Sequence, residues 1–412
     1  MAENDIILPR WQSQTIQTAM AERRVLLLVG PRQCGKTTLL GDLNVKGAEL
    51  RTLDDPTLLT LAQSDPKSFV SHQSSLLMID EIQRAPALLP VIKQVVDQNR
   101  RPGQFLLTGS ANIQSLPTVQ ESLAGRVTKI RLRPLSQGEI KKNTPKFLKK
   151  AFAGDFNYSW EVYNRDQIME IAFRGGFPET IHMEPRARRK WHKDYIDALL
   201  ERDLKDIAKI RRKEAMADLV KVMASWSSKY MDISAIGAKL SLQRQTLETY
   251  INALETLYLV ERVPPWTKTD YQRVGKHAKG FMSDSGLMTS LLGWNADQVR
   301  LDSDRIGKLF ETFVFAELST LIDIGGEDYQ LYQYRDRTKH EIDFLIERSD
   351  GALLGVEVKA STVVQENDFK HLRWFKDNLI GDRPFVGIVL YAGEFSGSMG
   401  NNMFAVPYGA LW

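Results

Sequence analysis

Residues 25–40 read VLLLVGPRQCGKTTLL, which is an apolar run followed by a glycine-containing loop and the beginning of a helical pattern. The apolar run, Val25–Val29, has the length and the content of valine and leucine that are typical of a buried parallel strand. The loop from Gly30 to Thr37 matches GxxxxGK[ST] at each fixed position. Strand, loop and helix occur in the order that a Walker A motif requires, so we interpret this stretch as a phosphate-binding loop.

Each part of this loop has an expected task in binding ATP and magnesium. Glycine at positions 30 and 35 lets backbone amides turn toward phosphate oxygens, and the helix N-terminus adds a favourable dipole. We expect Lys36 to contact the β and γ phosphates and Thr37 to offer its hydroxyl to magnesium. Cys34 allows two interpretations, a redox switch beside a helix N-terminus or a small apolar side chain. The predicted nucleotide contacts are Gly30, Pro31, Arg32, Gln33, Cys34, Gly35, Lys36, Thr37 and Thr38.

A second apolar run, Leu76–Ile79, continues directly into Asp80 and Glu81, as in a Walker B strand. Asp80 is expected to hold the magnesium shell, and Glu81 to orient or deprotonate the attacking water. The alternative is a strand that merely ends in an acidic turn.

A third apolar run, Phe105–Leu107, ends in small polar residues, so Thr108 and Ser110 are candidate sensors of the γ-phosphate. Arg126 leads the next strand-like segment and is a candidate arginine finger, which would act on a neighbouring subunit's nucleotide. A local ion pair is the alternative role for this arginine.

The series VGPRQCGKTTLL, LLMIDEIQ, LLTGSAN and SLAGRV, followed by RLRPLSQGE, resembles the bacterial and archaeal AAA-superfamily ATPases that carry a long C-terminal region. The resemblance implies binding and hydrolysis of ATP with magnesium, in a homo-oligomer. It does not say what work the hydrolysis performs.

Composition limits the remaining possibilities. A chain of 412 residues with 43% hydrophobic, 26% charged and 9% aromatic residues is typical of several folded domains, and differs from collagen or a disordered segment. Its one cysteine excludes an intramolecular disulfide and a multi-cysteine zinc site. The N-terminus lacks a signal-peptide pattern, and no apolar run approaches the ~18 residues of a membrane span, so we expect a cytoplasmic protein with no membrane partner.

The net charge of +4 does not by itself indicate a nucleic-acid-binding protein. The basic residues are nevertheless gathered in clusters at 141–150, 186–193 and 209–213, which favours a polyanionic partner over three unrelated solvated surfaces. Residues 136–213 otherwise show a mainly helical pattern with a turn at 174–178, and we interpret them as a helical lid or linker.

Residues 214–282 show a helix, a turn at Ser241 and a second helix, then a strand-like tail and a basic loop. This order predicts a winged-helix domain. Some domains of this fold bind DNA, and others bind protein partners. On DNA, Arg244 and Gln245 would lie near base edges, and the loop lysines and arginine would contact phosphates. The predicted DNA contacts are Arg244, Gln245, Lys268, Arg273, Lys276 and Lys279.

Near the C-terminus, Asp343 precedes the triplet Glu357-Val358-Lys359, and Glu311 lies on an apolar helix upstream. A turn at 349–351 could bring the two strands together as a hairpin. The arrangement resembles the PD-(D/E)xK nuclease superfamily, most closely its archaeal Holliday-junction resolvase branch. In that resemblance Glu311, Asp343 and Glu357 bind magnesium, and Lys359 activates water or stabilises the phosphorane. An ion pair at a strand edge is the alternative for Glu357 and Lys359.

The sequence therefore predicts an α/β chain with a P-loop AAA-type ATPase domain (1–135), a helical lid (136–213), a winged helix (214–282) and a restriction-endonuclease-like α/β domain (283–412). The first functional hypothesis is an ATPase that binds branched or duplex DNA, such as Holliday junctions, with metal-dependent cleavage left open. The second keeps DNA binding with an inactive nuclease fold. The third is a nucleotide-dependent switch that acts on a protein partner.

Overall fold

The computed structural model describes residues 7–109, 125–202, 213–268 and 277–412. The chain forms two compact units. The first consists of residues 1–135, 198–211 and 252–259, and the second of residues 136–197, 212–251 and 260–412. The predicted division of the region after residue 135 into lid, winged helix and nuclease-like domain stays a prediction.

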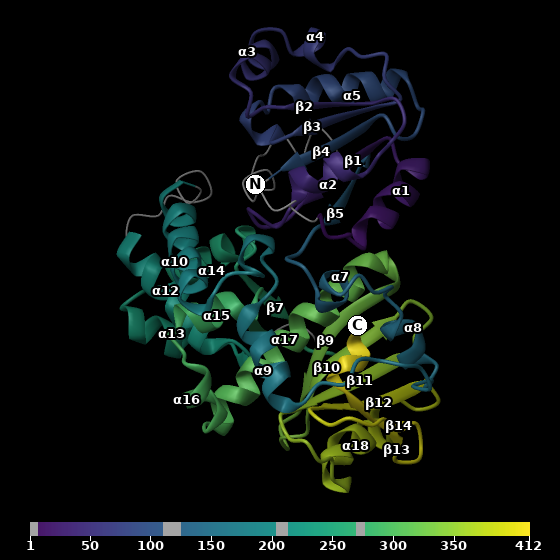
Figure 1. Cartoon of the computed structure of the whole chain (residues 1–412), viewed down its shortest axis with the longest axis vertical. Coiled ribbons are helices and arrows are strands. Elements are labelled where there is room, and N and C mark those ends of the chain that lie inside the picture. The colour runs from purple at the N-terminus through teal and green to yellow at the C-terminus, as the bar shows by residue number, and fades with distance from the viewer. Residues whose placement is uncertain (1–6, 110–124, 203–212, 269–276) are drawn as a thin grey trace. The chain divides into compact units, whose positions relative to one another are not determined.

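The first unit contains a five-stranded parallel sheet in the order β2-β3-β4-β1-β5 (Figure 1). Its strands are β1 (Val25–Val29), β2 (Ala48–Thr52), β3 (Leu76–Asp80), β4 (Phe105–Gly109) and β5 (Val127–Arg131). Every residue of β1, β3 and β4 is buried, as expected for central strands of a parallel sheet that is covered on both faces. Because β4 lies between β1 and β3, the ends of the Walker A and Walker B strands flank the end of β4.

The helices of the first unit are α1 (Gln12–Glu22), α2 (Lys36–Asp42), α3 (Pro56–Ser64), α4 (Pro66–Val70) and α5 (Leu88–Gln98), with a 3₁₀ turn at Ile82–Arg84. Asp55 and Asp65 begin α3 and α4 by accepting hydrogen bonds from backbone amides of the first turn, with proline as the first helical residue. These short helices are thus specified locally.

The second unit begins with the helices α7 (Gln137–Ile140), α8 (Phe147–Phe152), α9 (Arg165–Arg174) and α10 (Pro185–Arg202), of which residues 198–202 are counted with the first unit. The next elements are α12 (Lys213–Trp226), β6 (Lys229–Tyr230), α13 (Ile233–Leu240), α14 (Arg244–Thr256), β7 (Val260–Val263) and β8 (Lys279–Met282). Residues 252–256 of α14 are likewise counted with the first unit. The strands form an antiparallel sheet in the order β6-β8-β7. Lys279, predicted to lie in an exposed basic loop, is instead the first residue of the central strand of this sheet.

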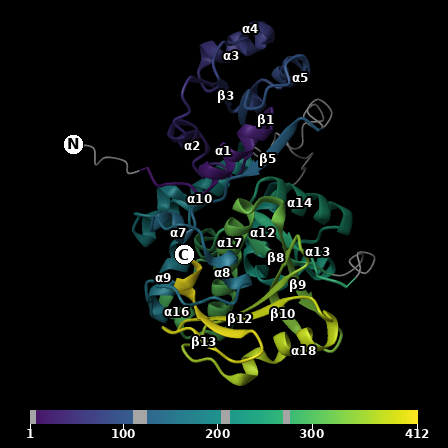
Figure 2. The ribbon, with the colours of Figure 1, turned by 90° about the vertical axis from the view of Figure 1, so that its right-hand side faces the viewer.

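The remainder of the second unit is a six-stranded mixed sheet in the order β13-β14-β12-β11-β10-β9. Its elements are α15 (Ser285–Leu291), α16 (Ala296–Arg300), α17 (Ser303–Ile324), β9 (Tyr329–Arg335), β10 (Glu341–Arg348), β11 (Leu353–Lys359), α18 (Lys370–Leu379), β12 (Phe385–Tyr391), β13 (Gly397–Ser398) and β14 (Met403–Pro407). Both views place α17 and α18 on opposite sides of this sheet (Figures 1 and 2). None of the helices in the described ranges is long and apolar enough to cross a bilayer.

Candidate functional sites

The phosphate loop is held in place by close backbone contacts. A Cβ atom at Gly30 would lie 2.1 Å from the carbonyl oxygen of Leu132, so only glycine fits there. Gly35, at the N-cap of α2, has a φ of +96°, a left-handed conformation that favours glycine. Glycine is therefore required at the two positions for different reasons, a close backbone contact at Gly30 and a left-handed conformation at Gly35.

Arg10, which no sequence pattern indicates, stabilises the phosphate loop through hydrogen bonds to backbone carbonyls. Its guanidinium donates to the carbonyl oxygens of Cys34 (2.7 Å) and Arg133 (2.6 Å). The thiol of Cys34 is fully buried and lies 3.5 Å from the carbonyl oxygen of Leu132. This cysteine packs as a small apolar side chain, which disfavours the redox-switch interpretation.

Lys36 is buried, and its ammonium donates to the carbonyl oxygens of Gly30 (3.1 Å) and Pro31 (2.8 Å). The charge therefore lies inside the curve of the loop, on the side where the loop backbone would surround a phosphate.

Asp80 is held between two hydroxyl groups, one from the first turn of α2 and one from the end of β4. Thr37 donates its hydroxyl to one carboxylate oxygen of Asp80 (2.9 Å), and Thr108 donates to the other. The Thr108 hydroxyl in turn accepts the backbone N–H of Glu81 (3.0 Å). Thr108 thus uses its hydroxyl to position Asp80 and Glu81, and its predicted contact with the γ-phosphate stays a prediction. A threonine hydroxyl beside a carboxylate is a donor set that fits magnesium.

Glu81 follows Asp80 with a φ of +58°, an uncommon backbone conformation for a residue other than glycine. Such conformations persist where the surrounding structure imposes them, often at functional sites. The Glu81 carboxylate accepts a hydrogen bond from the side-chain amide of Gln83. Glu81 is thereby oriented separately from Asp80, as its predicted role in placing water requires.

Arg126 forms an ion pair with Asp97, with 2.6 Å between Nε and Oδ1. A local ion pair is the alternative role that the sequence analysis gives for Arg126. Its action on the nucleotide of a neighbouring subunit stays a prediction, and Ser110, the other candidate sensor, lies outside the described residues.

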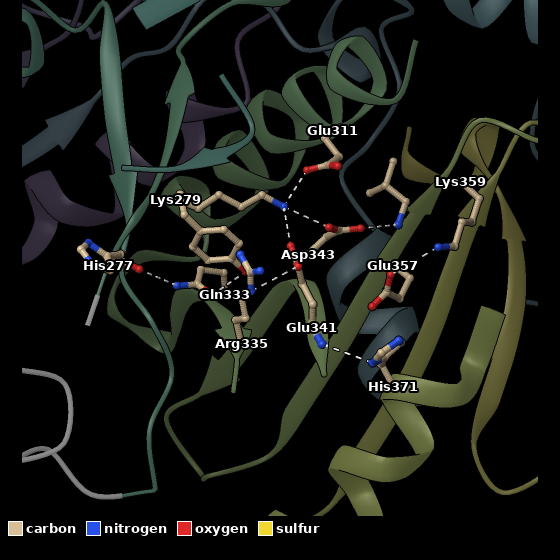
Figure 3. A network of polar contacts seen from close by, with 12 residues as sticks. His277, Lys279, Glu311, Gln333, Arg335, Glu341, Asp343, Glu357, Lys359 and His371 are labelled. Carbon is tan, nitrogen blue, oxygen red and sulfur yellow. Dashed lines mark hydrogen bonds and ion pairs between the residues drawn. The ribbon is translucent and has the colours of Figure 1, made fainter. Parts of the chain in front are cut away.

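A second polar cluster lies in the C-terminal part of the chain, around the ammonium group of Lys279 (Figure 3). This ammonium lies 2.7 Å from the carboxylate of Glu311, 3.0 Å from that of Asp343 and 3.7 Å from that of Glu341. The side chain of Lys279 is only 2% exposed. The three carboxylates come from α17 and β10, and the lysine enters from β8.

Asp343 links this cluster to the predicted Glu357-Val358-Lys359 triplet. Its second carboxylate oxygen accepts the backbone N–H of Val358 (3.0 Å), and the register of β10 against β9 shifts between Ile342 and Leu345. Asp343 lies within this irregular stretch of the strand pair. Glu357 and Lys359 lie on one face of β11, with 3.7 Å between carboxylate and ammonium.

Burial and like charge alter the protonation of these groups. Burial, followed by the charge of Asp343, raises the pKa of Glu311 to about 7. The same two causes raise the pKa of Glu357 well above its ordinary value. Burial alone would lower the pKa of Lys279, but the charges of Glu311, Asp343 and Glu341 raise it well above its ordinary value. Lys279 is therefore a permanent cation in the cluster.

These residues do not fit a magnesium ion as the resemblance implied. Within the described ranges, no three histidine, cysteine, aspartate or glutamate side chains are arranged to hold a metal. Two of the three predicted ligands, Glu311 and Asp343, instead bind the ammonium of Lys279. The expectation that Lys279 contacts DNA phosphates is wrong, because this side chain is buried and ion-paired.

Of the other predicted DNA contacts, three are exposed in the structure and two lie outside the described residues. Arg244 is exposed at the start of α14 and pairs with Glu248 (3.0 Å), and Gln245 and Lys268 are exposed too. Arg273 and Lys276 lie outside the described residues.

Comparison with known proteins identifies the domain in which the first of these candidate sites lies. Residues 22–141 match the family model described as "AAA domain". The chain contains a P-loop ATPase domain of the AAA type. The matched range includes the Walker A loop and the Walker B strand, and the prediction of a P-loop domain of the AAA type is confirmed.

The rest of the ATPase matches families whose descriptions give no function. Residues 165–298 match a domain of unknown function, DUF8612, and residues 306–411 match another, DUF4143. The chain is 27% identical over 395 residues to the uncharacterized protein Rv2008c of Mycobacterium tuberculosis and to the uncharacterized protein Mb2031c of Mycobacterium bovis. The match covers 95% of this chain and 82% of each relative.

Solved structures resemble the ATPase only loosely. The RuvB Holliday junction branch migration motor of Thermotoga maritima is 17% identical, with 62% of this chain and 90% of RuvB covered and a TM-score of 0.28. AMPPCP-bound DnaA of Aquifex aeolicus is 13% identical, with 60% and 85% covered and a TM-score of 0.29. Because both TM-scores are below 0.5, neither likeness bears on what the chain does.

The sequence patterns miss Arg10 and Glu341, and they predict Lys279 as a DNA contact and not as a member of the carboxylate cluster. No pattern marks Arg10, which acts on the phosphate loop through a contact 24 residues along the chain. Lys279 could have been suspected from charge, because three buried carboxylates with one lysine call for a further cation.

Proposed function

We propose that the chain couples magnesium-dependent ATP hydrolysis in its AAA domain to DNA binding by its second unit, without cutting the DNA. The observation that carries the ATPase part is the pair of hydroxyls, from Thr37 and Thr108, that hold the Walker B carboxylate of Asp80 beside the phosphate loop. Branched DNA such as a Holliday junction is the proposed substrate.

The residues of the ATP site divide the chemistry among them. Thr37 and Asp80 would hold magnesium, which neutralises charge on the phosphates. The ammonium of Lys36 would exchange its bonds to the loop carbonyls for bonds to phosphate oxygens. Glu81 would orient the attacking water. Arg126 would act on the nucleotide of an adjacent subunit in a homo-oligomer.

A winged-helix arrangement supports the DNA-binding part of the proposal. The helices α12, α13 and α14 and three strands follow one another in the order helix, strand, helix, helix, strand, strand, and the strands pair as β6-β8-β7. The first turn of α14 exposes Arg244 and Gln245, side chains that suit base edges in a major groove.

The order of elements around the carboxylate cluster supports a nuclease-like fold. It consists of α17, an antiparallel meander of β9, β10 and β11, then α18 and the parallel strand β12. The position of Lys279 among the carboxylates favours a domain that binds DNA without cleaving it.

The test measures ATP turnover and DNA binding by the full-length protein with no DNA, linear duplex and a four-way junction. We expect wild-type turnover to rise with the junction, and Glu81→Gln to abolish turnover while ATP still binds. Glu22→Gln, at an exposed carboxylate on α1, is the matched control and should behave as the wild type.

DNA affinity should fall steeply with salt, since neutralised phosphates release counterions. Turnover that ignores every DNA, with no DNA affinity even at low salt, would instead favour the nucleotide-dependent protein switch. Strand nicks that require Asp343 would refute the non-cutting part of the proposal.

A further inference from the structure

In the carboxylate cluster, Glu311 and Asp343 bind the ammonium of Lys279 where the nuclease resemblance implies a metal ion. We propose that Lys279 is a tethered cation which takes the place of a divalent metal among Glu311, Asp343 and Glu357, and that removing it exposes a latent divalent-cation site. This inference rests on the nuclease-like fold of the proposed function, but not on ATP turnover or on DNA binding.

Both carboxylate oxygens of Asp343 already accept a hydrogen bond, one of them from Lys279. One carboxylate oxygen of Asp343 accepts the ammonium and the other accepts the N–H of Val358. Glu311 is bound to the same ammonium at 2.7 Å. A metal that uses Glu311 and Asp343 would have to displace the lysine from both.

The lysine is held firmly in this position. Lys279 begins β8, the central strand of its sheet, and is paired in register with Tyr230 of β6 and Val263 of β7. The rings of Tyr230 and Phe281 lie within 6.0 Å and 5.9 Å of the ammonium, close enough for cation–π attraction. Displacing the side chain would therefore cost more than rotating an exposed lysine.

The charges around Lys279 point to a cation as the group that would replace it. Glu311, Glu341 and Asp343 surround its ammonium, and Arg335 pairs with Glu341, at 3.9 Å. One carboxylate oxygen of Glu357, a residue only 6% exposed, has no hydrogen-bond partner within the described structure. A buried unpaired oxygen beside other carboxylates is a ready ligand for a hard divalent cation.

The test uses Mn²⁺, a paramagnetic substitute for magnesium, and the full-length protein without nucleotide. Electron paramagnetic resonance counts bound Mn²⁺ in the wild type, Lys279→Met, Lys279→Met/Asp343→Asn and Lys370→Met, the last as a control at an exposed lysine. We expect Lys279→Met to bind about one Mn²⁺ per chain at this site. The wild type, the double variant and the control should not bind it there.

Thermal unfolding provides a second readout. Mn²⁺ at about 100 times its dissociation constant should raise the melting temperature of Lys279→Met by about 5 °C, and leave that of the wild type unchanged. Should Lys279→Met fail to fold, Lys279→Met/Glu341→Gln removes one of the surplus carboxylates.

Three results would overturn the proposal. They are Mn²⁺ bound by the wild type and lost in Asp343→Asn, a folded Lys279→Met that binds none, and failure of both Lys279 variants to fold even with Mn²⁺. ATP turnover and junction binding are measured on the same preparations. Their absence contradicts the proposed function and leaves the Mn²⁺ result standing.

Discussion

The substitution Glu317→Gln should make the second unit more stable at alkaline pH. Glu317 lies on α17 with its side chain buried, and its carboxylate accepts the backbone N–H of Gln137 through both oxygens (3.0 and 3.2 Å). Burial raises the pKa of Glu317 from 4.5 to about 8, and the hydrogen bond from Gln137 only partly opposes it. Between about pH 4.5 and pH 8, Glu317 is therefore protonated in the folded protein and ionised in the unfolded chain.

The sign of the effect follows from proton binding. Between pH 4.5 and pH 8 the folded state binds more protons at this position than the unfolded state, so the free energy of unfolding falls as pH rises. One pKa unit corresponds to about 1.4 kcal/mol, so the wild type should lose about 3 kcal/mol through this group between pH 5 and pH 8. A glutamine accepts the same hydrogen bond without ionising, and avoids this loss.

Urea unfolding at pH 5 and pH 8, followed by tryptophan fluorescence, measures the difference. The signal reports mainly on the second unit, because every tryptophan except Trp11 lies there. Glu317→Gln should match the wild type near pH 5 and exceed it at pH 8, while Glu170→Gln, at an exposed carboxylate, should follow the wild type throughout. Parallel pH profiles for the wild type and Glu317→Gln would refute the reasoning.

Three further predictions concern the proposed ATPase and DNA-binding roles. Gly30→Ala should abolish binding of a fluorescent ATP analogue, because the new Cβ meets a backbone carbonyl at 2.1 Å, whereas Gly41→Ala, with open space around it, should bind normally. Thr108→Val keeps the shape of the side chain but loses the bonds to Asp80 and Glu81, so kcat should fall about 10- to 100-fold with little change in melting temperature; an unchanged kcat would remove Thr108 from the site. Arg244→Ala should cost about 1–3 kcal/mol of DNA binding in a fluorescence-anisotropy titration, and equal affinity would show that α14 does not contact DNA.

The ATP site could be predicted because its chemistry lies in short contiguous segments. Gly30, Lys36 and Thr37 belong to one loop, and Asp80 directly follows an apolar strand, so the linear pattern specifies their neighbourhood. The role of Thr108 could not be read in the same way. Its bonds to Asp80 and Glu81 depend on β4 lying between β1 and β3, which is a property of the sheet order.

For the carboxylate cluster, the sequence predicts the pairing of the two strands but not the position of Lys279. The spacing of Asp343 and Glu357 predicts a hairpin, and the two strands do pair. The sequence places Lys279 in a basic loop and so predicts a phosphate contact, whereas a lysine can be fully buried when it is ion-paired. Its partners lie 32 to 64 residues further along the chain, and only the three-dimensional structure brings them together.

The most direct test of the coupling between ATP and DNA is a linkage measurement on Glu81→Gln, which should bind ATP without consuming it. The dissociation constant for a four-way junction is measured with and without ATP, and that for ATP with and without the junction. Coupled sites must change each other's affinity by the same factor, so we expect two equal shifts of about 5-fold or more. Junction affinity that is identical with and without ATP would contradict the account.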